Sequence, residues 1–350
     1  MNFSFSKVII ESMGHVLPPQ VITSEEIEDV LGSLYERLRL PRGRLQLMTG
    51  IRERRAWKES TLPSQGSTEA AQKALDKTSI PREAIALLIH TSVCRDHLEP
   101  ATAAYVHHNL RLSSQAAFFD LSNACLGFIN GMVLAASLIE GGQIPAALIV
   151  SGENGKPLLE HTLDFLKENQ TMTRQGIKSY FANLTIGSGA VAAILCHESL
   201  GNKEKTPWRF KAVSSLSDTE GCHLCQGDAI GKDRLTMETA SEELMGRGIA
   251  LAHTNWQQFL RYTGLTIETL GHTICHQVGE RHRALLYRHL ALDLGKDFST
   301  FPFLGNTGSV ALPLTLSLAI ENRVLTPGER VALLAIGSGL SSMMALVENV

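Results

Sequence analysis

The chain has 350 residues, of which 44% are hydrophobic and only 6% aromatic, and its net charge at pH 7 is −3. This length allows one large or two ordinary domains, and the scarcity of aromatic residues predicts a mostly aliphatic core. Acidic and basic residues are interleaved, which gives no indication of nucleic-acid or membrane-surface binding and favours a small-molecule substrate.

The N-terminus, MNFSFSKVIIESMG, lacks the apolar run of a signal peptide. The longest apolar runs elsewhere fall short of the roughly 18 residues that a membrane span needs. We therefore expect a soluble cytoplasmic protein. Its six cysteines are spaced irregularly, so we expect them to be reduced thiols rather than disulfides.

Short apolar runs rich in β-branched residues alternate with helical patterns, which is typical of an α/β fold with helices on both faces of a parallel or mixed sheet. The predicted strands cover residues 84–91, 116–121, 146–151, 189–196, 271–275, 298–303, 330–336 and 343–347. Residues 155–184 interrupt this alternation with helical, mixed-charge sequence. Because 198–206 is typical of a polar linker, we divide the chain into halves 1–200 and 201–350.

The two halves contain a weak repeat. When Cys125 is aligned with Asn306, apolar positions coincide through a helical segment that ends on an Ile-Glu pair in both copies, and a turn and a strand follow. Such a duplication brings the two strand-to-helix joins face to face, where the N–H groups of the helix starts favour an anion. The GSG runs at 187–189 and 337–339 predict turns where the backbone passes close to another group.

Cys125 lies where a short predicted strand ends and a long apolar helical segment begins. A thiolate is a strong nucleophile, and we expect the helix start to lower the pKa of this cysteine. A buried free cysteine is more often just a small hydrophobic residue. However, His276 follows the predicted strand 271–275, and Asn306 lies at the repeated join. A Cys-His-Asn set suits acyl-thioester chemistry, because the thiol accepts the acyl group while imidazole and amide donate hydrogen bonds to a developing oxyanion or enolate.

The ordered motifs ACLGF, CHQ and GNTGS, with GIRERR at 50–55 and GSG near the C-terminus, resemble the thiolase superfamily in its ketoacyl-synthase III branch. The resemblance covers nearly the whole chain. It implies a five-layer α/β/α/β/α fold from two similar halves, a homodimer, and no cofactor apart from the coenzyme A of the substrate. It also implies that Cys125 carries the acyl group, that His276 and Asn306 complete the site, and that the N–H groups of Cys125 and Ser338 form an oxyanion hole.

The stretch TSVCRDHLEPATAA, residues 91–104, resembles the OleA-type acyl-CoA condensing enzymes of olefin biosynthesis. Similar stretches are ITSEEI at 22–27, INGM at 129–132 and GSGL at 337–340. The resemblance implies that Glu99 reaches the partner subunit's site and removes the α-proton of a second acyl thioester. Malonyl donors form their carbanion by losing CO₂, whereas a plain acyl thioester needs such a base. The implied reaction is a non-decarboxylative Claisen condensation of two fatty acyl-CoA molecules through acyl-Cys125 to a β-keto product.

Two positions depart from the pattern of this branch. Leu304 stands two residues before the asparagine, where the branch usually has histidine, and Met48 stands near the place of a coenzyme-binding arginine in many ketoacyl synthase III enzymes. Arg52, Arg54 and Arg55 are candidates for binding the phosphates of the substrate, and a solvated arginine cluster is the competing interpretation.

Other functions share parts of the pattern. A decarboxylative ketoacyl synthase III would use the same Cys-His-Asn set with a malonyl carrier protein, and only Glu99 argues against it. An acyltransferase that passes the acyl group to an alcohol or amine would make less use of Asn306. A silent subunit would lack the cysteine, and a lipid-binding protein would leave Cys125 unacylated. The CHLC run at 222–225 is a weak zinc pattern without a second pair at suitable spacing, so we expect no metal site.

Overall fold

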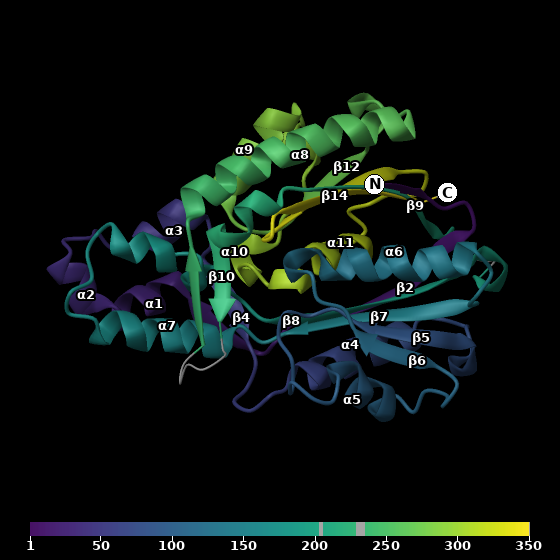
Figure 1. The fold of residues 1–350 in the computed structure, drawn as a ribbon, viewed down its shortest axis with the longest axis horizontal. Coiled ribbons are helices and arrows are strands. Elements are labelled where there is room, and N and C mark those ends of the chain that lie inside the picture. Colours follow the sequence, from purple (N-terminus) through teal and green to yellow (C-terminus); the bar gives the residue numbers. More distant parts are fainter. Residues whose placement is uncertain (203–205, 229–234, 350) are drawn as a thin grey trace.

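The computed structural model describes residues 1–202, 206–228 and 235–349, and its class is the predicted α/β (Figure 1). Residues 203–205 of the predicted linker lie outside the described residues. The first half-sheet has the order β2-β8-β7-β5-β6, with strands at Val8–Val16, Gly189–His197, Ala146–Glu153, Ile85–His90 and Ala117–Asp120. The second has the order β12-β13-β14-β9, with β1 beside β9. Its strands are His272–Cys275, Arg330–Gly337, Ser341–Asn349, Trp208–Ser217 and Asn2–Ser4.

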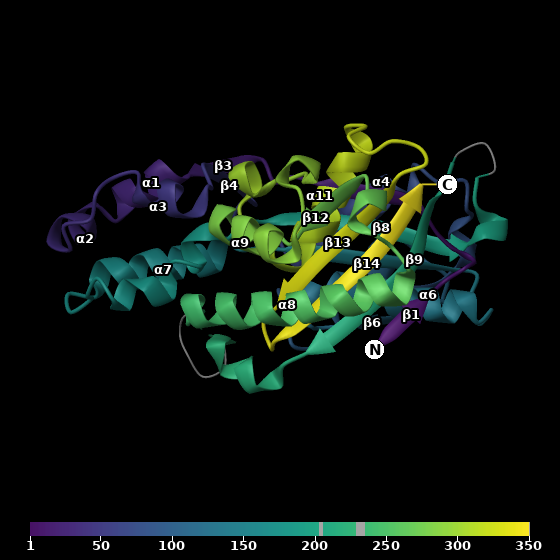
Figure 2. The same ribbon diagram turned by 90° about the horizontal axis from the view of Figure 1, so that it is seen from above.

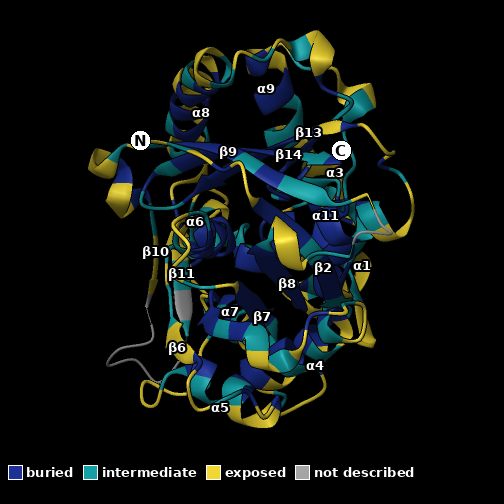
Figure 3. Ribbon diagram, turned by 90° about the vertical axis from the view of Figure 1, so that its right-hand side faces the viewer, coloured by how far each residue is buried: buried dark blue, intermediate teal, exposed yellow. Residues whose placement is uncertain are grey.

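The two half-sheets are stacked, and helices form the remaining layers (Figures 1 and 2). The central helices are α6 (Gly127–Glu140) and α11 (Ala311–Glu321). The outer helices are α8 (Ser241–Thr263) and α9 (Glu280–Leu290) over the second half-sheet, and α4 (Pro63–Leu75) and α5 (Thr102–Asn109) over the first. Both central helices are buried over most of their length because a sheet covers each side (Figure 3). The predicted five-layer fold is confirmed.

The internal repeat is also confirmed. The central helices end at the aligned residues Glu140 and Glu321. The strand that follows the central helix in each half, β7 or β13, pairs in parallel with an earlier strand, β5 or β12. It pairs antiparallel with the next strand along the chain, β8 or β14. Cys125 and Asn306 therefore precede equivalent helices in the centre of the molecule.

One predicted strand is wrong. Residues 298–303 form no strand: a single parallel bridge joins Thr273 to Asp297, and α10 (Phe301–Leu304) follows. Pro302 has no N–H group for a sheet ladder but fits the first turn of a helix. The remaining short strands are β3 (Gln20–Thr23), β4 (Glu53–Ala56), β10 (Cys225–Asp228) and β11 (Thr236–Thr239).

A helical extension projects from one end of the layers (Figure 1). It combines α1 (Ser24–Val30), α2 (Gly32–Arg37) and α3 (Arg44–Thr49) with α7 (Lys156–Glu168), around an apolar cluster of its own. The Arg37 guanidinium donates to main-chain carbonyls just beyond α7 at 2.8 to 2.9 Å. The helical character predicted for 155–184 is confirmed, and its packing against α1 to α3 is a new finding. Among the described residues, no helix has both the length and the apolar character that a membrane crossing requires.

Candidate active site

Cys125 lies in a tight turn at the start of α6, as predicted. It is the middle residue of a 3-10 helix, Ala124–Leu126, that leads directly into α6. Ala124 has a φ of +45°, which residues with a Cβ rarely adopt, so this turn is strained. Gly127 lets the helix approach the end of β5, because a Cβ there would lie 2.6 Å from the carbonyl oxygen of Thr91.

The turn between β13 and β14 passes over the main chain of Cys125. A Cβ at Gly337 would lie 3.0 Å from Cγ of Leu126 and 3.7 Å from the nitrogen of Cys125. Ser338 is the next residue in this turn. The N–H groups of Cys125 and Ser338 are therefore on neighbouring segments, as the predicted oxyanion hole requires, and that role stays a prediction.

The thiol of Cys125 has a raised pKa, contrary to our expectation from the helix start. Burial is the main cause that raises this pKa to about 12, and the Glu153 carboxylate and Cys225 contribute in the same direction. Removing the sulfur from water disfavours the thiolate more than the helix start favours it. At neutral pH the side chain is a thiol, so its attack on a thioester requires a base.

His276 can supply that base. It follows β12, its N–H donates to the Leu334 carbonyl of β13 at 2.8 Å, and its side chain is buried. Burial, with a smaller contribution from His282, lowers the pKa of His276 to about 3, so the imidazole is neutral at neutral pH. Its Nδ1 has no hydrogen-bond partner among the described residues. A neutral imidazole with an unused nitrogen is able to accept a proton.

Asn306 is held by its main chain in a defined orientation. Its N–H donates to the Thr185 carbonyl and its carbonyl accepts from Gly187 N–H, both at 2.9 Å. Its Oδ1 accepts from Gly308 N–H at 3.1 Å, so Nδ2 remains available to donate within the described part of the chain. A Cβ at Gly187 would lie 2.1 Å from the Leu304 carbonyl oxygen, which confirms the close approach predicted for the first GSG run.

Gln277 joins the histidine and asparagine segments. Its Oε1 accepts from the N–H groups of Thr300 and Phe301 at 2.8 and 3.1 Å, and its Nε2 donates to the Cys275 carbonyl at 2.6 Å. It lies in the CHQ motif, but the contacts that give it a role join segments more than 20 residues apart and leave no local signal. The Cys125 turn itself packs against β13 and against the turn after Asn306. The structure therefore brings together the segments that carry the predicted cysteine, histidine and asparagine.

Glu99 lies apart from this set, on the exposed loop between β5 and α5. The carboxylate of Asp120, at the end of β6, accepts from the N–H groups of Thr102 and Ala103 at 2.8 Å each, at the start of α5. The Glu99 loop is thus tied to the end of β6, the last strand of the sheet.

The comparisons with known proteins agree with this geometry. Family profiles described as 3-oxoacyl-(acyl-carrier-protein) synthase III and its C-terminal part match residues 119–206 and 260–349. An acyl-CoA:acyl-CoA alkyltransferase of Shewanella oneidensis is 38% identical over 344 residues, covering 97% of this chain and 98% of the relative. One of Xanthomonas campestris is 37% identical over 343 residues, covering 98% and 99%. The chain belongs to this alkyltransferase branch of the 3-oxoacyl-(acyl-carrier-protein) synthase III family.

Solved structures support the same assignment. A structure of a Xanthomonas campestris OleA variant with bound lauric acid and lauroyl-CoA has a TM-score of 0.93 and 37% identity, covering 98% of this chain and 99% of that one. A beta-ketoacyl-(acyl-carrier-protein) synthase III of Symbiobacterium thermophilum is less similar, at 28% identity over 349 residues, covering 95% and 94%. The protein is an acyltransferase of the thiolase superfamily, and it is similar to OleA in particular.

Arg54 of this family member is buried, with 1% of its surface exposed. Its guanidinium donates to the carbonyls of Ile22 and Leu184 and to the Ser24 hydroxyl at 3.0 to 3.2 Å. Burial lowers the pKa of Arg54 to about 10. This position does not fit the phosphate-binding role predicted for Arg54. Arg52 is exposed and Arg55 partly exposed, so the prediction remains open for these two.

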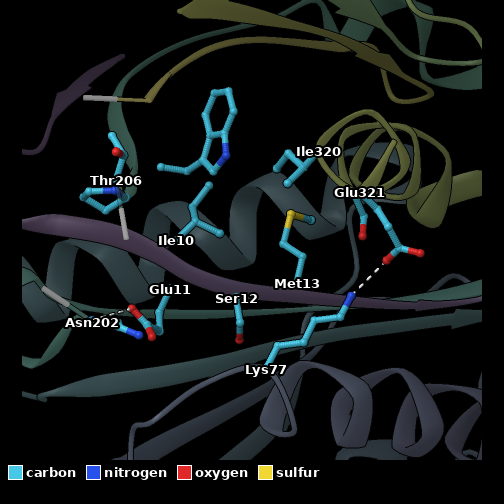
Figure 4. A pocket seen from close by; sticks show the side chains of 12 residues that line it. Ile10, Glu11, Ser12, Met13, Lys77, Asn202, Thr206, Ile320 and Glu321 are labelled. Atoms are coloured by element: carbon cyan, nitrogen blue, oxygen red, sulfur yellow. Dashed lines mark hydrogen bonds and ion pairs between the residues drawn. The ribbon is translucent and has the colours of Figure 1, made fainter. Parts of the chain in front are cut away.

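A surface cavity of about 240 Å³ lies elsewhere, at the seam between β2 and β9 (Figure 4). Its apolar wall includes Ile10 and Trp208, and the ion pair between Lys77 and Glu321, at 2.9 Å, closes one side. Glu321 is the last residue of α11, whereas Asn306 precedes that helix. The cavity is therefore at the opposite end of α11 from the catalytic segments, and none of the predicted catalytic residues lines it.

The CHLC run is not arranged as a metal site in the described part of the chain. Cys222 is exposed and Cys225 partly buried at the start of β10, where its sulfur accepts a hydrogen bond from the Thr239 hydroxyl at 3.6 Å. Among the described residues, no three His, Cys, Asp or Glu side chains form a group that could hold a metal ion.

Proposed function

We propose that this protein joins two fatty acyl-CoA molecules by a Claisen condensation without loss of CO₂. The observation that carries the proposal is the assembly of the Cys125, His276 and Asn306 segments, with the exposed Glu99 loop tied to the edge of the sheet. Its support from relatives is the 38% identity to an acyl-CoA:acyl-CoA alkyltransferase over nearly the whole chain.

The first half-reaction transfers an acyl group to Cys125. The thiol attacks the carbonyl carbon of the first acyl-CoA, and neutral His276 accepts the thiol proton as the carbon–sulfur bond forms. The N–H groups of Cys125 and Ser338 donate to the developing oxyanion. The bond to coenzyme A then breaks, and the leaving thiolate takes the proton back from the imidazolium. Acyl-Cys125 and free coenzyme A result.

The second half-reaction forms the carbon–carbon bond. Glu99 of the partner subunit removes an α-proton from a second acyl-CoA, and Asn306 and His276 donate hydrogen bonds to the enolate oxygen. The α-carbon attacks the carbonyl of acyl-Cys125. The carbon–sulfur bond to Cys125 breaks, and the thiolate recovers a proton from the protonated Glu99. A β-keto thioester results, and the enzyme returns to its starting state.

The edge of the first half-sheet supports the proposal of a homodimer. β6 ends the first half-sheet, and its Phe118 and Phe119 are 43% and 37% exposed. An apolar strand edge with unpaired main-chain groups favours pairing with another strand. Pairing of β6 with the same strand of a second copy would cover both rings. Because the Glu99 loop is tied to the end of β6, this pairing would carry Glu99 of each subunit into the interface.

Two further features of the proposal concern the substrate and the cell. Of the three candidate arginines, Arg52 and Arg55 remain as residues that could bind the phosphates of coenzyme A. A cytoplasmic location stays a prediction from the sequence.

The Glu99→Gln variant tests the proposal, because it should separate the two half-reactions. It should still release coenzyme A and gain one acyl group on Cys125, while condensed product falls by about 10²-fold or more, the usual contribution of a positioned general base. Glu83→Gln, at an exposed position before β5, is the matched control and should condense normally. Normal product from Glu99→Gln would exclude this role for Glu99.

A further inference from the structure

Glu153 is a buried carboxylate beside the catalytic segments that no step of the proposed mechanism uses. It is the last residue of β7 and is only 4% exposed. Among the described residues, no lysine or arginine forms an ion pair with it. A buried carboxylate is costly unless other groups satisfy its oxygens. The groups that donate to Glu153 therefore indicate its role.

Donors to Glu153 on one side belong to the start of the Glu99 loop. The N–H of Val93 donates to Oε1 at 2.9 Å, and the N–H of Cys94 donates to Oε2 at 3.0 Å. Two successive N–H groups on one carboxylate fix the peptide plane between them. This plane sets the direction in which the chain leaves β5 toward Glu99.

Donors on the other side belong to the turn after Asn306. The hydroxyl of Ser309 donates to Oε1 of Glu153 at 2.6 Å, and the N–H of Ser309 donates to the same oxygen at 3.3 Å. A Cβ at Gly308 would lie 3.2 Å from this oxygen, and Gly308 has a φ of +59°. Because Gly308 N–H in turn holds Oδ1 of Asn306, the carboxylate is connected to the catalytic amide through two adjacent residues.

A chain of buried hydroxyls extends this connection across the two halves. The Ser309 hydroxyl is 2.6 Å from that of Ser151, which is 3.0 Å from that of Ser92. Since Ser309 gives its proton to Glu153, Ser151 donates to Ser309 and Ser92 donates to Ser151. The N–H of Gly152 donates to Ser92 at 2.7 Å and supports the far end. The hydroxyls of this chain all direct their protons toward Glu153.

The third catalytic segment lies against the same turn: β7, which ends at Glu153, packs on the turn after Asn306, and the Cys125 turn packs on that turn as well. In agreement, the Glu153 carboxylate contributes to the raised pKa of Cys125. We propose that Glu153 is a positioning residue that holds the Glu99 loop and the Asn306 turn in register with the thiol of Cys125. This inference rests on the proposed function, since the register matters for a condensation in which a base, an amide and an acyl-cysteine act together.

Glu153→Gln is the informative substitution because it replaces one of the two acceptor oxygens by an NH₂ group, so one donor must lose its acceptor. The amide group cannot replace Oε1, which receives the N–H of Val93 and both donors of Ser309. It must therefore replace Oε2, where it faces the N–H of Cys94 and leaves that group without an acceptor. The variant should keep the Asn306 turn and the Val93 contact, and loosen the Glu99 loop at Cys94. Glu140→Gln is the matched control, because Glu140 also accepts N–H groups, those of Ser6 and Lys7, but at the far end of α6.

Three readouts separate this role from simple destabilisation. In Glu153→Gln, acylation of Cys125 should persist, while condensed product should fall about 10- to 100-fold because the base is displaced. Exchange of the α-proton of acyl-CoA in D₂O, measured with Cys125 also replaced by alanine, should fall with it. Alkylation of Cys125 by iodoacetamide between pH 7 and 9 should become faster, by about tenfold for each unit by which loss of the carboxylate charge lowers the thiol pKa.

Each outcome decides the inference. Loss of condensation and of α-proton exchange with faster alkylation supports it, and behaviour like that of the wild type in all three readouts overturns it. If Glu153→Gln does not fold, Ser309→Ala tests the Asn306 side. Both condensation and α-proton exchange should slow while acylation of Cys125 persists, because Asn306 stabilises the enolate, and condensation at the wild-type rate would overturn the inference. If the wild-type protein forms no condensed product, the proposed function fails, while the alkylation rates still show whether Glu153 acts on Cys125.

Discussion

The buried, neutral state of His276 has a measurable effect on stability. Burial lowers the pKa of His276 from 6.5 to about 3. Between these two values the unfolded chain binds a proton that the folded protein does not, so stability is present above pH 6.5 and is lost as the pH falls toward 3. At about 1.4 kcal/mol per pKa unit, lowering the pH from 7 to 5 should cost roughly 2 kcal/mol through this residue alone.

Replacing the histidine by a residue that does not titrate should remove this contribution. In His276→Asn, the loss of unfolding free energy between pH 7 and pH 5 should be about 2 kcal/mol smaller than in the wild type. Urea unfolding at both pH values measures it, followed by the fluorescence of Trp256, which is buried in the same apolar cluster as Cys275. His289→Asn, at an exposed position, should leave the pH dependence unchanged. An equal loss in His276→Asn and wild type would refute a neutral, buried imidazole.

Two further predictions concern the sheet edge and the arginines. Phe118→Glu should convert a dimer to monomers in sedimentation velocity and abolish condensation. Leu47→Glu, at a site 85% exposed, is the control and should have neither effect. A Phe118→Glu protein that stays dimeric would contradict pairing along β6. Arg54→Leu should lower the unfolding free energy by on the order of 3 kcal/mol, because it leaves buried carbonyls without donors, and should not change KM for acyl-CoA. Arg52→Ala should raise KM for acyl-CoA with little effect on stability. A destabilised Arg52→Ala protein with unchanged KM, together with a raised KM in Arg54→Leu, would contradict both assignments.

Hydrophobic pattern alone predicted most of the sheet but not its centre. The runs that form β5, β7, β8 and β13 are continuous and apolar, as strands covered on both faces are. β2 and β9 lie between β13 and β8 in the sheet order. β2 has the sequence VIIESMGHV, and its polar residues interrupt the apolar run. Their side chains meet the few polar groups of the neighbouring layers; the Ser12 hydroxyl, for example, donates to the Ala74 carbonyl at 2.8 Å. Such pairing depends on the fold and leaves no periodic signal.

The predicted site shows the same division between local and long-range information. Motif order, the end of β12 and the internal repeat pointed to Cys125, His276 and Asn306, because each can be recognised from its own segment. The structure brings these segments together, and their catalytic roles stay a prediction. The raised pKa of Cys125 could not be predicted, since it depends on burial by segments far away in the sequence. Glu153 was missed for the same reason: a glutamate at the end of the apolar run ALIVSGE is visible in the sequence, but its donors lie about 60 and 156 residues away.

The most direct test of the central claim is to incubate the purified protein with equal amounts of unlabelled and fully deuterated long-chain acyl-CoA and no malonyl donor, and to analyse products by mass spectrometry. A condensation of two acyl-CoA molecules should give unlabelled, mixed and doubly labelled β-keto products or derived ketones, each built from two acyl chains, together with release of coenzyme A. Acylation of Cys125 without any two-chain product, and condensation only after a malonyl carrier is added, would contradict it.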